Sequence, residues 1–330
     1  MPRTTLKRSL GLPMITFYGV GTIVGGGFYA LAGKVSAEAG MLTPLAFLVA
    51  AFIATFSAFS YAELSARYPV SAGEAHYVLA AFRRLWPSAL VGWAVIATGI
   101  VSAATLAVAF AGFVRTLLDV PEWLTICVMV IGLGLIAAWG IGESALFALV
   151  ITIIELGGLL IVGVAAADQL PTISERWHEL LPGLSFSTWQ GVMLGAYLAF
   201  YSFVGFEDMV NVAEEVKQPQ RNLPIAILAS LALTGLLYSF VTLVIVLAVD
   251  QEQLVASETP LALVFPPGGS MARMISGIGM LAGLNGALVQ IVMASRVAYG
   301  MARRSTAPQI FARVNAWTQT PLLATFVVTM

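Results

Sequence analysis

The chain has 330 residues, of which 59% are apolar and only 10% are charged, and its net charge is −1. Soluble domains carry about 25% charged residues, so this composition excludes an ordinary soluble enzyme and predicts a protein of the lipid bilayer. No basic patch indicates a nucleic-acid partner, and the single cysteine, Cys127, excludes an intrachain disulfide.

Eight long apolar stretches are each sufficient for a helix of about 20 residues to cross a bilayer. In chain order the predicted spans are 12–33, 43–65, 86–114, 122–140, 145–167, 190–213, 223–249 and 271–297. A ninth span begins near Pro321 and is cut off at Met330. The sequence therefore predicts a fragment, or a product truncated in its ninth span.

The charges between the spans predict the orientation. With the N-terminus inside, twelve of the 16 Lys and Arg residues fall in cytoplasmic segments and four in outer segments. This is the bias of the positive-inside rule. The basic start, residues 1–11, is predicted to flank the first span in the cytoplasm, because no signal-peptide cleavage site follows it. The segment 70–86 is predicted to form a cytoplasmic interfacial helix.

Two spans have weak centres. The first contains three consecutive glycines, Gly25, Gly26 and Gly27, each costing about 1 kcal/mol relative to Ala inside a helix. Irregular backbone at this depth is tolerated only where it faces protein or water. The sixth span has its weak centre at 202–205 and crosses in the opposite direction. Such paired interruptions indicate a transporter built from inverted repeats, although close helix packing through small residues is the alternative.

Two sequence blocks resemble the amino acid–polyamine–organocation permeases. The first block, within 22–78, contains TIVGGGFYALAGKVSAEAG and FSYAELSARYPVSAGEAHYV. The second, at 199–227, is AFYSFVGFEDMVNVAEEVKQPQRNLPIAI, in which AEEVKQPQRNLP is highly specific. The shorter matches GIGES at 140–144 and MASRVAYGMAR at 293–303 support the resemblance.

The resemblance implies an all-α polytopic membrane protein of the LeuT type. In this fold the first ten helices form two inverted five-helix repeats, and helices 1 and 6 are broken. On this chain the first repeat would cover about 12–167. The second would cover about 190–330 and would be incomplete, with its third helix followed only by the start of the next.

The resemblance also implies where substrate binds, between the two broken helices, with walls from the third and eighth. The substrate-binding positions all lie at the broken centres: Ile23, Gly25, Gly26, Gly27, Tyr201, Ser202, Phe203 and Gly205. The three glycine N–H groups would hold the α-carboxylate of an amino acid, and carbonyl groups near the other positions would hold its α-ammonium. Both assignments agree with the helix dipole. Tyr201 matches an aromatic gate over substrate, with packing inside the bundle as the alternative.

Acidic residues inside the spans are candidates for the coupling group. An intramembrane ionisable group costs at least about 2.5–3.5 kcal/mol, so each is a functional hypothesis. Glu155, in the fifth span, replaces a lysine of several proton-coupled relatives, and Glu207 follows the second weak centre by two residues. Either is predicted to exchange protons, and the alternative is a protonated acid bonded to a carbonyl. Sodium is less favoured, because 277–294 contains no Ser or Thr.

Other charged residues have simpler explanations. Glu63 precedes Arg67 by four residues, so an ion pair along the helix accounts for it. Asp208 points about 100° away from Glu207 around a helix, so the two need not share a pocket. Glu214 and Glu215 are predicted to be part of a cytoplasmic gate or a solvated helix end.

The sequence therefore predicts a secondary active amino-acid permease of a plasma or inner membrane, driven by protons or by exchange. No cofactor, metal site or enzyme chemistry is expected, because His76 and His178 stand apart from any ligand set. One alternative is a polyamine or small-amine carrier, with Glu207 or Asp208 holding the amine. The other is a truncated product that inserts without transporting. The sequence does not indicate which amino acid is carried, symport or antiport, or the oligomeric state.

Overall fold

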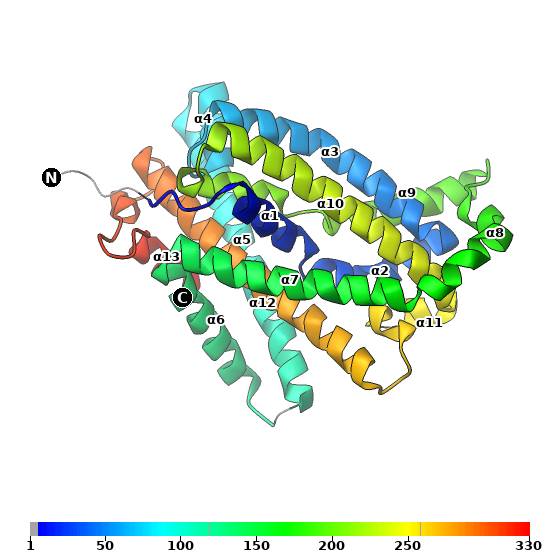
Figure 1. The fold of residues 1–330 in the computed structure, drawn as a ribbon. Coiled ribbons are helices and arrows are strands. Elements are labelled where there is room, and N and C mark those ends of the chain that lie inside the picture. The colour runs from blue at the N-terminus through cyan, green and yellow to red at the C-terminus, as the bar shows by residue number, and fades with distance from the viewer. Residues whose placement is uncertain (1–5, 118, 258) are drawn as a thin grey trace.

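Long helices packed side by side form the bundle seen in the computed structural model (Figure 1). The structure describes residues 6–117, 119–257 and 259–330, without the side chains of Gly26, Ala30, Phe113, Thr116 and Leu117. The first five residues of the predicted basic flank lie outside this range. The first half contains α1 Leu12–Val24, α2 Gly26–Ala39, η1 Gly40–Leu42, α3 Thr43–Arg67, α4 Gly73–Phe82, α5 Leu85–Leu117, α6 Glu122–Trp139 and α7 Ile141–Ala165. The second half contains η2 Ala167–Thr172, α8 Ile173–Arg176, η3 Trp177–Leu180, α9 Phe186–Tyr201, η4 Phe206–Glu215, α10 Pro219–Ala248, α11 Gln251–Ala256, η5 Pro260–Val264, α12 Ser270–Arg303, η6 Gln309–Ala312 and α13 Leu322–Thr329.

Six helical stretches of the described chain are long and apolar enough to cross a membrane: Leu31–Arg67, Leu85–Gly112, Glu122–Trp139, Ile141–Ala165, Pro219–Ala248 and Ser270–Arg303. They correspond to the predicted second to fifth, seventh and eighth spans, with ends that differ by a few residues. The predicted first and sixth spans are missing from this set because each is divided into two shorter helices. The protein is therefore an integral membrane protein with an all-helical fold.

The first break lies at a single residue. Gly25 ends α1 and precedes α2, with φ −31° and ψ −178°. Gly26 and Gly27 are already the first two residues of α2, so the break is narrower than the predicted three-residue centre. The reason is that a glycine can also serve as a first-turn residue, whereas the change of direction needs only one non-helical residue.

The second break covers the predicted positions 202–205. The chain leaves α9 after Tyr201, makes a turn and resumes as η4, a 3₁₀ helix, at Phe206. Gly205 has φ +135°, a conformation that is accessible to glycine and strained for other residues. The predicted interruption of the sixth span is confirmed.

One predicted boundary is wrong at the eighth span. The span was expected to end at 297, shortly after Arg296, whereas α12 continues to Arg303. Arg296, one residue before this predicted end, is fully buried within the helix. A charged residue marks the end of a membrane span reliably only when its side chain is exposed to water. Here the side chain is paired inside the protein.

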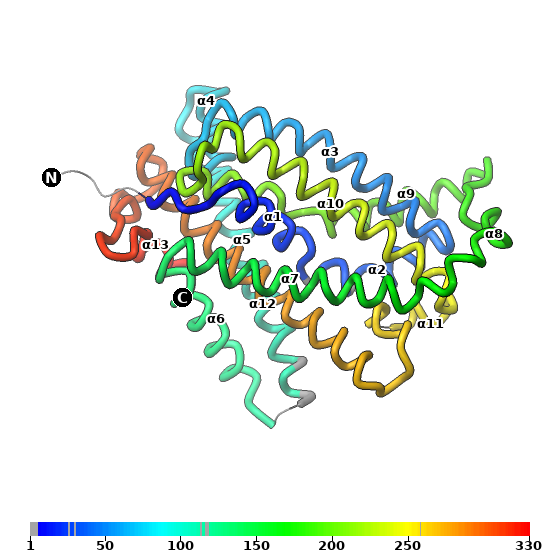
Figure 2. Tube along the Cα trace, in the orientation of Figure 1, coloured from blue at the N-terminus to red at the C-terminus, as the bar shows by residue number. Residues whose placement is uncertain are grey.

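Close helix contact shapes the core. The helices α3 and α10 lie side by side along their length (Figure 2), and they make the most extensive helix–helix contact in the bundle. On α3 an alanine is buried every fourth residue from Ala46 to Ala62. A stripe of small side chains lets neighbouring helices approach α3 closely, as where Ala46 faces Gly195 of α9. The helices α5 and α12 form a second long pair in contact.

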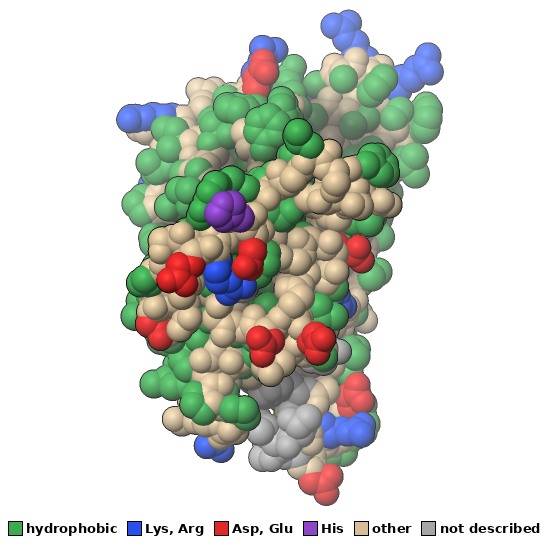
Figure 3. Space-filling view, turned by 90° about the vertical axis from the view of Figure 1, so that its right-hand side faces the viewer, with side chains coloured by type: hydrophobic (Ala, Val, Ile, Leu, Met, Phe, Trp, Pro, Cys, Tyr) green, Lys and Arg blue, Asp and Glu red, His purple; other side chains and the backbone are tan. Residues whose placement is uncertain are grey.

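The bundle has two different ends. The N-terminal end, defined here by the N-terminal segment, α4 and η6, is the end predicted to be cytoplasmic (Figure 1). The opposite end, the α8 end, carries α8, η3 and α11. Figure 3 views this end and shows acidic side chains spread over its middle.

Candidate functional site

The two breaks contact one another inside the bundle. A Cβ atom at Gly205 would lie 2.7 Å from the carbonyl oxygen of Thr22, in the last turn of α1. A Cβ atom at Gly27 would lie 4.0 Å from the Cα atom of Ser202. The turn of the second break therefore lies directly against the first. Both the positive φ and the lack of space require glycine at 205.

The start of α2 presents free backbone donors. Gly25 precedes this helix without a side-chain cap, and Gly26 and Gly27 occupy its first positions. The first N–H groups of an α-helix have no partner within the helix, and they carry the positive end of its dipole. This is the arrangement that binds a carboxylate or another anion.

The carbonyl groups predicted to bind the α-ammonium differ from the prediction in one respect. The carbonyl of Ile23 already accepts a 2.9 Å hydrogen bond from the hydroxyl of Tyr238. Phe203 is buried, with its ring 5.3 Å from that of Tyr238, so only its backbone is available to a ligand. Ser202 is 2% exposed, and its Oγ has no hydrogen-bond partner among the described residues. A buried hydroxyl without a partner costs about 1–3 kcal/mol, so the Ser202 hydroxyl has unused hydrogen-bonding capacity at the second break.

A cavity of about 570 Å³ opens beside the breaks. Its walls come from α2, α5, α12 and η5, and Gly27 and Tyr201 belong to its lining. The helices α5 and α12 are the third and eighth predicted spans, which the resemblance gave as walls. Lys34 and Thr259 also line the cavity, which therefore extends toward the α8 end. Its size is typical of a small-molecule site.

Tyr201 lines this cavity and is 67% exposed. The alternative prediction, that it packs inside the bundle, is therefore wrong. The bundle aromatic at this break is Phe203, two residues later, which packs against Phe47 and Tyr238. The 3₁₀-like turn rotates the two side chains to opposite sides.

Glu155 is fully buried on α7 and is hydrogen-bonded to residues of α2 and α12. The amide Nδ2 of Asn285 on α12 lies 3.5 Å from Glu155 Oε1, 3.2 Å from Thr152 Oγ1 and 3.4 Å from the carbonyl oxygen of Gly21 on α1. The hydroxyl of Tyr29 on α2 donates to the backbone carbonyl of Glu155 at 2.9 Å. Glu155 Oε2 and Asn285 Oδ1 have no partner within the described chain. The cluster thus joins both halves of the broken first span to α7 and α12.

Glu207 and Asp208 take separate hydrogen-bond partners. Glu207 Oε2 accepts a 2.8 Å hydrogen bond from the backbone N–H of Gly205 and so closes the turn of the second break. Asp208 Oδ2 accepts a 2.8 Å bond from Gln290 on α12. The alternative for Glu207, a protonated acid bonded to a carbonyl, does not describe this contact, because the backbone group is a donor.

Sequence reasoning missed a third acid near this region. On α4, outside the predicted spans, Glu74 Oε1 accepts from Asn211 Nδ2 at 3.2 Å, and Asn211 Oδ1 accepts from the N–H of Gly73 at 3.0 Å. Burial raises the pKa of Glu74 to about 7, the bond from Asn211 opposes this, and the charge of Glu207 adds to it. The segment was predicted to be an interfacial helix, and its pattern does not reveal that Glu74 faces η4.

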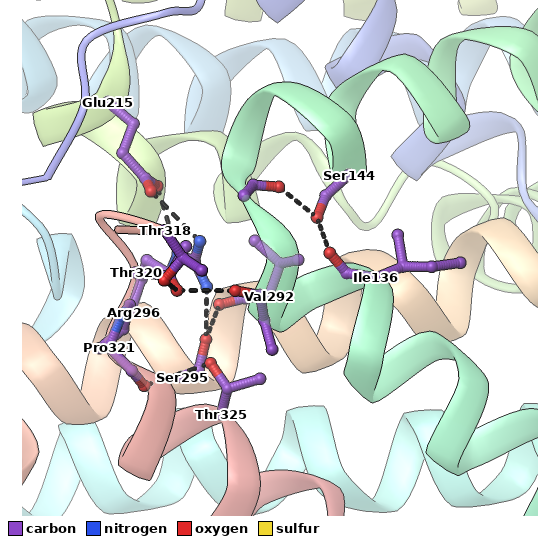
Figure 4. Close-up of polar contacts among 12 residues, drawn as sticks. Ile136, Ser144, Glu215, Val292, Ser295, Arg296, Thr318, Thr320, Pro321 and Thr325 are labelled. Carbon is purple, nitrogen blue, oxygen red and sulfur yellow. Dashed lines mark hydrogen bonds and ion pairs between the residues drawn. The ribbon is translucent and has the colours of Figure 1, made fainter. Parts of the chain in front are cut away.

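A buried ion pair closes the N-terminal end. The guanidinium of Arg296 on α12 donates to Glu215 through Nη2 at 3.2 Å and through Nε at 3.3 Å, and both side chains are fully buried. Figure 4 shows the two side chains directed at one another, with Ser295 Oγ beside the guanidinium. The solvated-helix-end alternative for Glu215 is therefore wrong.

The N-terminal segment joins this closure through its backbone. The N–H groups of Ser9 and Leu10 donate to the carbonyl of Glu215 at 3.0 and 3.1 Å, and the N–H of Lys217 donates to the carbonyl of Leu10 at 2.8 Å. Glu214 accepts from Arg303 at 3.2 Å, near the surface. The described conformation is thus sealed at the N-terminal end, while the cavity at the breaks reaches the α8 end.

The fold and the paired breaks define a membrane transporter of the inverted-repeat class. The chain matches the model of the amino acid permease family over residues 10–330 and belongs to this family.

Among curated proteins it is 30% identical to the chloroplastic cationic amino acid transporter 9 of Arabidopsis thaliana, over 94% of this chain and 58% of that protein. It is 28% identical to a branched-chain amino acid permease of Bacillus subtilis, over 98% and 73%. It is 26% identical to the methylthioribose transporter of the same bacterium, over 98% and 73%. The chain thus spans between about half and three quarters of the length of the curated relatives it matches.

Two solved structures share the fold. One is a Na+-coupled sialic acid symporter, with a TM-score of 0.61 and 12% identity over 96% of this chain and 71% of that chain. The other is the manganese transporter of Eremococcus coleocola, with a TM-score of 0.56 and 13% identity over 99% and 72%. At this identity they establish the arrangement of the helices and nothing about the substrate.

Proposed function

We propose that this chain carries amino acids across a membrane by alternating access. One observation carries the proposal: the two broken spans meet, with the free N–H groups of α2 and the unpartnered Ser202 hydroxyl at the junction. Positive and negative backbone ends side by side complement the two charges of an amino acid. The names of the relatives, permeases and transporters of amino acids, support the same substrate class.

In this proposal the α-carboxylate binds the N–H groups of Gly25, Gly26 and Gly27. The α-ammonium binds Ser202 and the carbonyls of the second break. Ile23 contributes less than predicted, because Tyr238 already uses its carbonyl. Tyr201 is the gate, since it stands in the open cavity beside Gly27.

Two acids are proposed for proton coupling, and each is linked to a break. Glu155 receives one long hydrogen bond to its carboxylate, which compensates a buried charge poorly. A change in its protonation would therefore alter the contact of α7 and α12 with Gly21 of α1. Glu207 holds the N–H of Gly205, so protonation there would release the turn.

The amine-carrier alternative is less well supported. It requires Glu207 or Asp208 to face the substrate, whereas the cavity beside the breaks has Tyr201 and Gly27 in its lining and the two acids bind Gly205 and Gln290. Uptake into proteoliposomes tests the choice, using a labelled amino acid and its decarboxylated amine under an inside-alkaline pH gradient. Accumulation of the amino acid alone supports the proposal. Accumulation of the amine alone, or of neither, contradicts it, and uptake only into preloaded vesicles identifies exchange.

Tyr201→Ala tests the gate directly. We expect a several-fold higher Km for uptake without loss of folded protein, because the side chain is largely exposed. Tyr197→Ala is the matched control, since Tyr197 lies one turn earlier on α9, is 78% exposed and does not line the cavity. Equal kinetics for the two variants would remove Tyr201 from the gate.

We further propose that the N-terminal end faces the cytoplasm of a plasma or inner membrane. The distribution of Lys and Arg supports this orientation. In a Cys127→Ser background, Arg313→Cys and Glu175→Cys introduce one thiol at each end, both at exposed positions. An impermeant thiol reagent added to intact cells should modify the second and spare the first. The reverse pattern would invert the orientation.

A further inference from the structure

A second cavity, of about 580 Å³, lies at the N-terminal end and is separate from the breaks. Three arginines from two parts of the chain line it: Arg8 on the N-terminal segment, and Arg303 and Arg304 at the end of α12. Glu214 is the single acid in the lining, which is completed by Leu6, Pro69 and Val70. The cavity wall therefore carries three positive charges against one negative charge.

The guanidinium groups keep most of their donors unused. Arg303 uses Nη1 to bond Glu214 and the hydroxyl of Tyr299. Arg304 uses Nη1 to bond the carbonyls of Ser71 and Gly300. Within residues 6–117, 119–257 and 259–330, their Nη2 and Nε groups and the side chain of Arg8 have no hydrogen bond to protein. A guanidinium has five N–H donors, so this wall lacks an acceptor.

The charge in the wall is also under-compensated. Burial lowers the pKa of Arg304, Glu214 partly opposes this, and the neighbouring Arg303 adds a smaller lowering. Glu214 is already engaged by Arg303 and by the N–H of Ser71 at 3.3 Å. A multivalent anion entering the cavity would offset the cost of holding these charges away from water.

We propose that this cavity binds a phosphate-bearing anion. Phosphate offers several oxygens to three guanidinium groups at once, and arginine recognises it through paired N–H donors. The source is either the headgroup of an anionic phospholipid or a soluble phosphate compound. Exposed aromatics near this end, Tyr68, Phe82 and Trp86, are of the kind found at the level of lipid headgroups, and basic pockets on the cytoplasmic side of transporters suit such headgroups.

The bound anion would act on the closure of this end. Arg8 precedes Ser9 and Leu10, which bond the carbonyl of Glu215, whereas Arg303 and Arg304 end α12. An anion that bridges the two parts holds the N-terminal segment on α12. It would therefore stabilise the conformation that is sealed at the N-terminal end. The binding itself does not depend on the transported substrate.

The test is a binding titration on the full chain purified in neutral detergent. The probes are short-chain phosphatidylglycerol, short-chain phosphatidylcholine as the zwitterionic control, and inorganic phosphate, with native mass spectrometry and thermal unfolding as readouts. We expect saturable binding of phosphatidylglycerol or of inorganic phosphate and a higher Tm in its presence. The first probe identifies a lipid source and the second a soluble one.

Arg8→Gln and Arg84→Gln form the matched pair of variants. Arg8 has no side-chain hydrogen bond to the described protein, so its replacement should leave the fold intact and weaken binding about fivefold. Arg84 is an exposed arginine between α4 and α5 that does not line the cavity, and its replacement should change nothing. The absence of saturable binding by both probes, or an equal loss in both variants, would overturn the proposal.

Discussion

Two buried glutamates of this protein have opposite surroundings. Glu215 at the N-terminal end and Glu155 beside the first break are both fully excluded from solvent. The carboxylate of Glu215 faces the guanidinium of Arg296, whereas among the described residues the carboxylate of Glu155 is bonded only to the amide of Asn285. A fully paired charge holds elements together, whereas a poorly paired one can change its protonation state. The paired Glu215 therefore has a structural role in the described conformation, whereas the poorly paired Glu155 is the better candidate for proton coupling.

The largest effect is expected from Arg296→Ala, which leaves Glu215 buried without its partner. Breaking such a pair costs about 3–5 kcal/mol, so the Tm in detergent should fall steeply or folded protein should be lost. The double variant Arg296→Met with Glu215→Leu removes both charges and should recover most of the stability. An unchanged Tm for the single variant would contradict the structural role of the pair.

The next effect concerns Glu74 and the pH. Its folded-state pKa of about 7 lies above the ordinary value of about 4.5, so the folded protein binds the proton more tightly than the unfolded chain. The contribution of Glu74 to the free energy of unfolding is therefore fully present below about pH 4.5. It is lost as the pH rises to 7, by up to about 3 kcal/mol. Glu74→Gln should flatten the dependence of Tm on pH in this window.

Glu63→Gln is the control for this pH dependence, because Glu63 is an exposed acid that pairs with Arg67 on α3, as predicted from their spacing. It should leave the profile as it is. A profile in Glu74→Gln that matches the wild type would show that Glu74 does not hold its proton in the folded protein.

A smaller loss of stability is expected from Gly205→Ala. The positive φ and the contact with the Thr22 carbonyl both oppose a Cβ atom, and strain of this kind costs about 1–3 kcal/mol. Uptake should fall further than stability, because the geometry of the breaks changes. Gly112→Ala on α5, where no atom lies within 4 Å of the new Cβ, should be neutral or slightly stabilising.

Glu155→Gln is expected to change stability least. It is also the sharpest test of the difference between Glu155 and Glu215. The substitution keeps the shape and a hydrogen bond with Asn285, so the Tm should move little. We expect at least about a tenfold loss of accumulation driven by a pH gradient, equivalent to about 1.4 kcal/mol, while exchange into preloaded vesicles persists. Gradient-driven accumulation at the wild-type level would remove Glu155 from coupling and leave Glu207.

The candidate site was partly predictable. The glycines of the first break, the turn at 202–205 and the buried acid Glu155 are visible in the sequence because each violates the pattern of a plain membrane helix. The use of the Ile23 carbonyl by Tyr238 was not visible, because the two residues are 215 positions apart. The same holds for Glu74, whose partner Asn211 lies 137 positions later.

The sequence by itself determined the class of protein, the helical spans and the position of both breaks, because hydrophobic length and glycine placement are local properties that act before tertiary contacts form. Only the tertiary structure decided how the buried polar groups are paired. It joined Arg296 to Glu215 and left Glu155 with a single long hydrogen bond. Such pairing depends on which helices meet and on how each is rotated, and local pattern does not specify either.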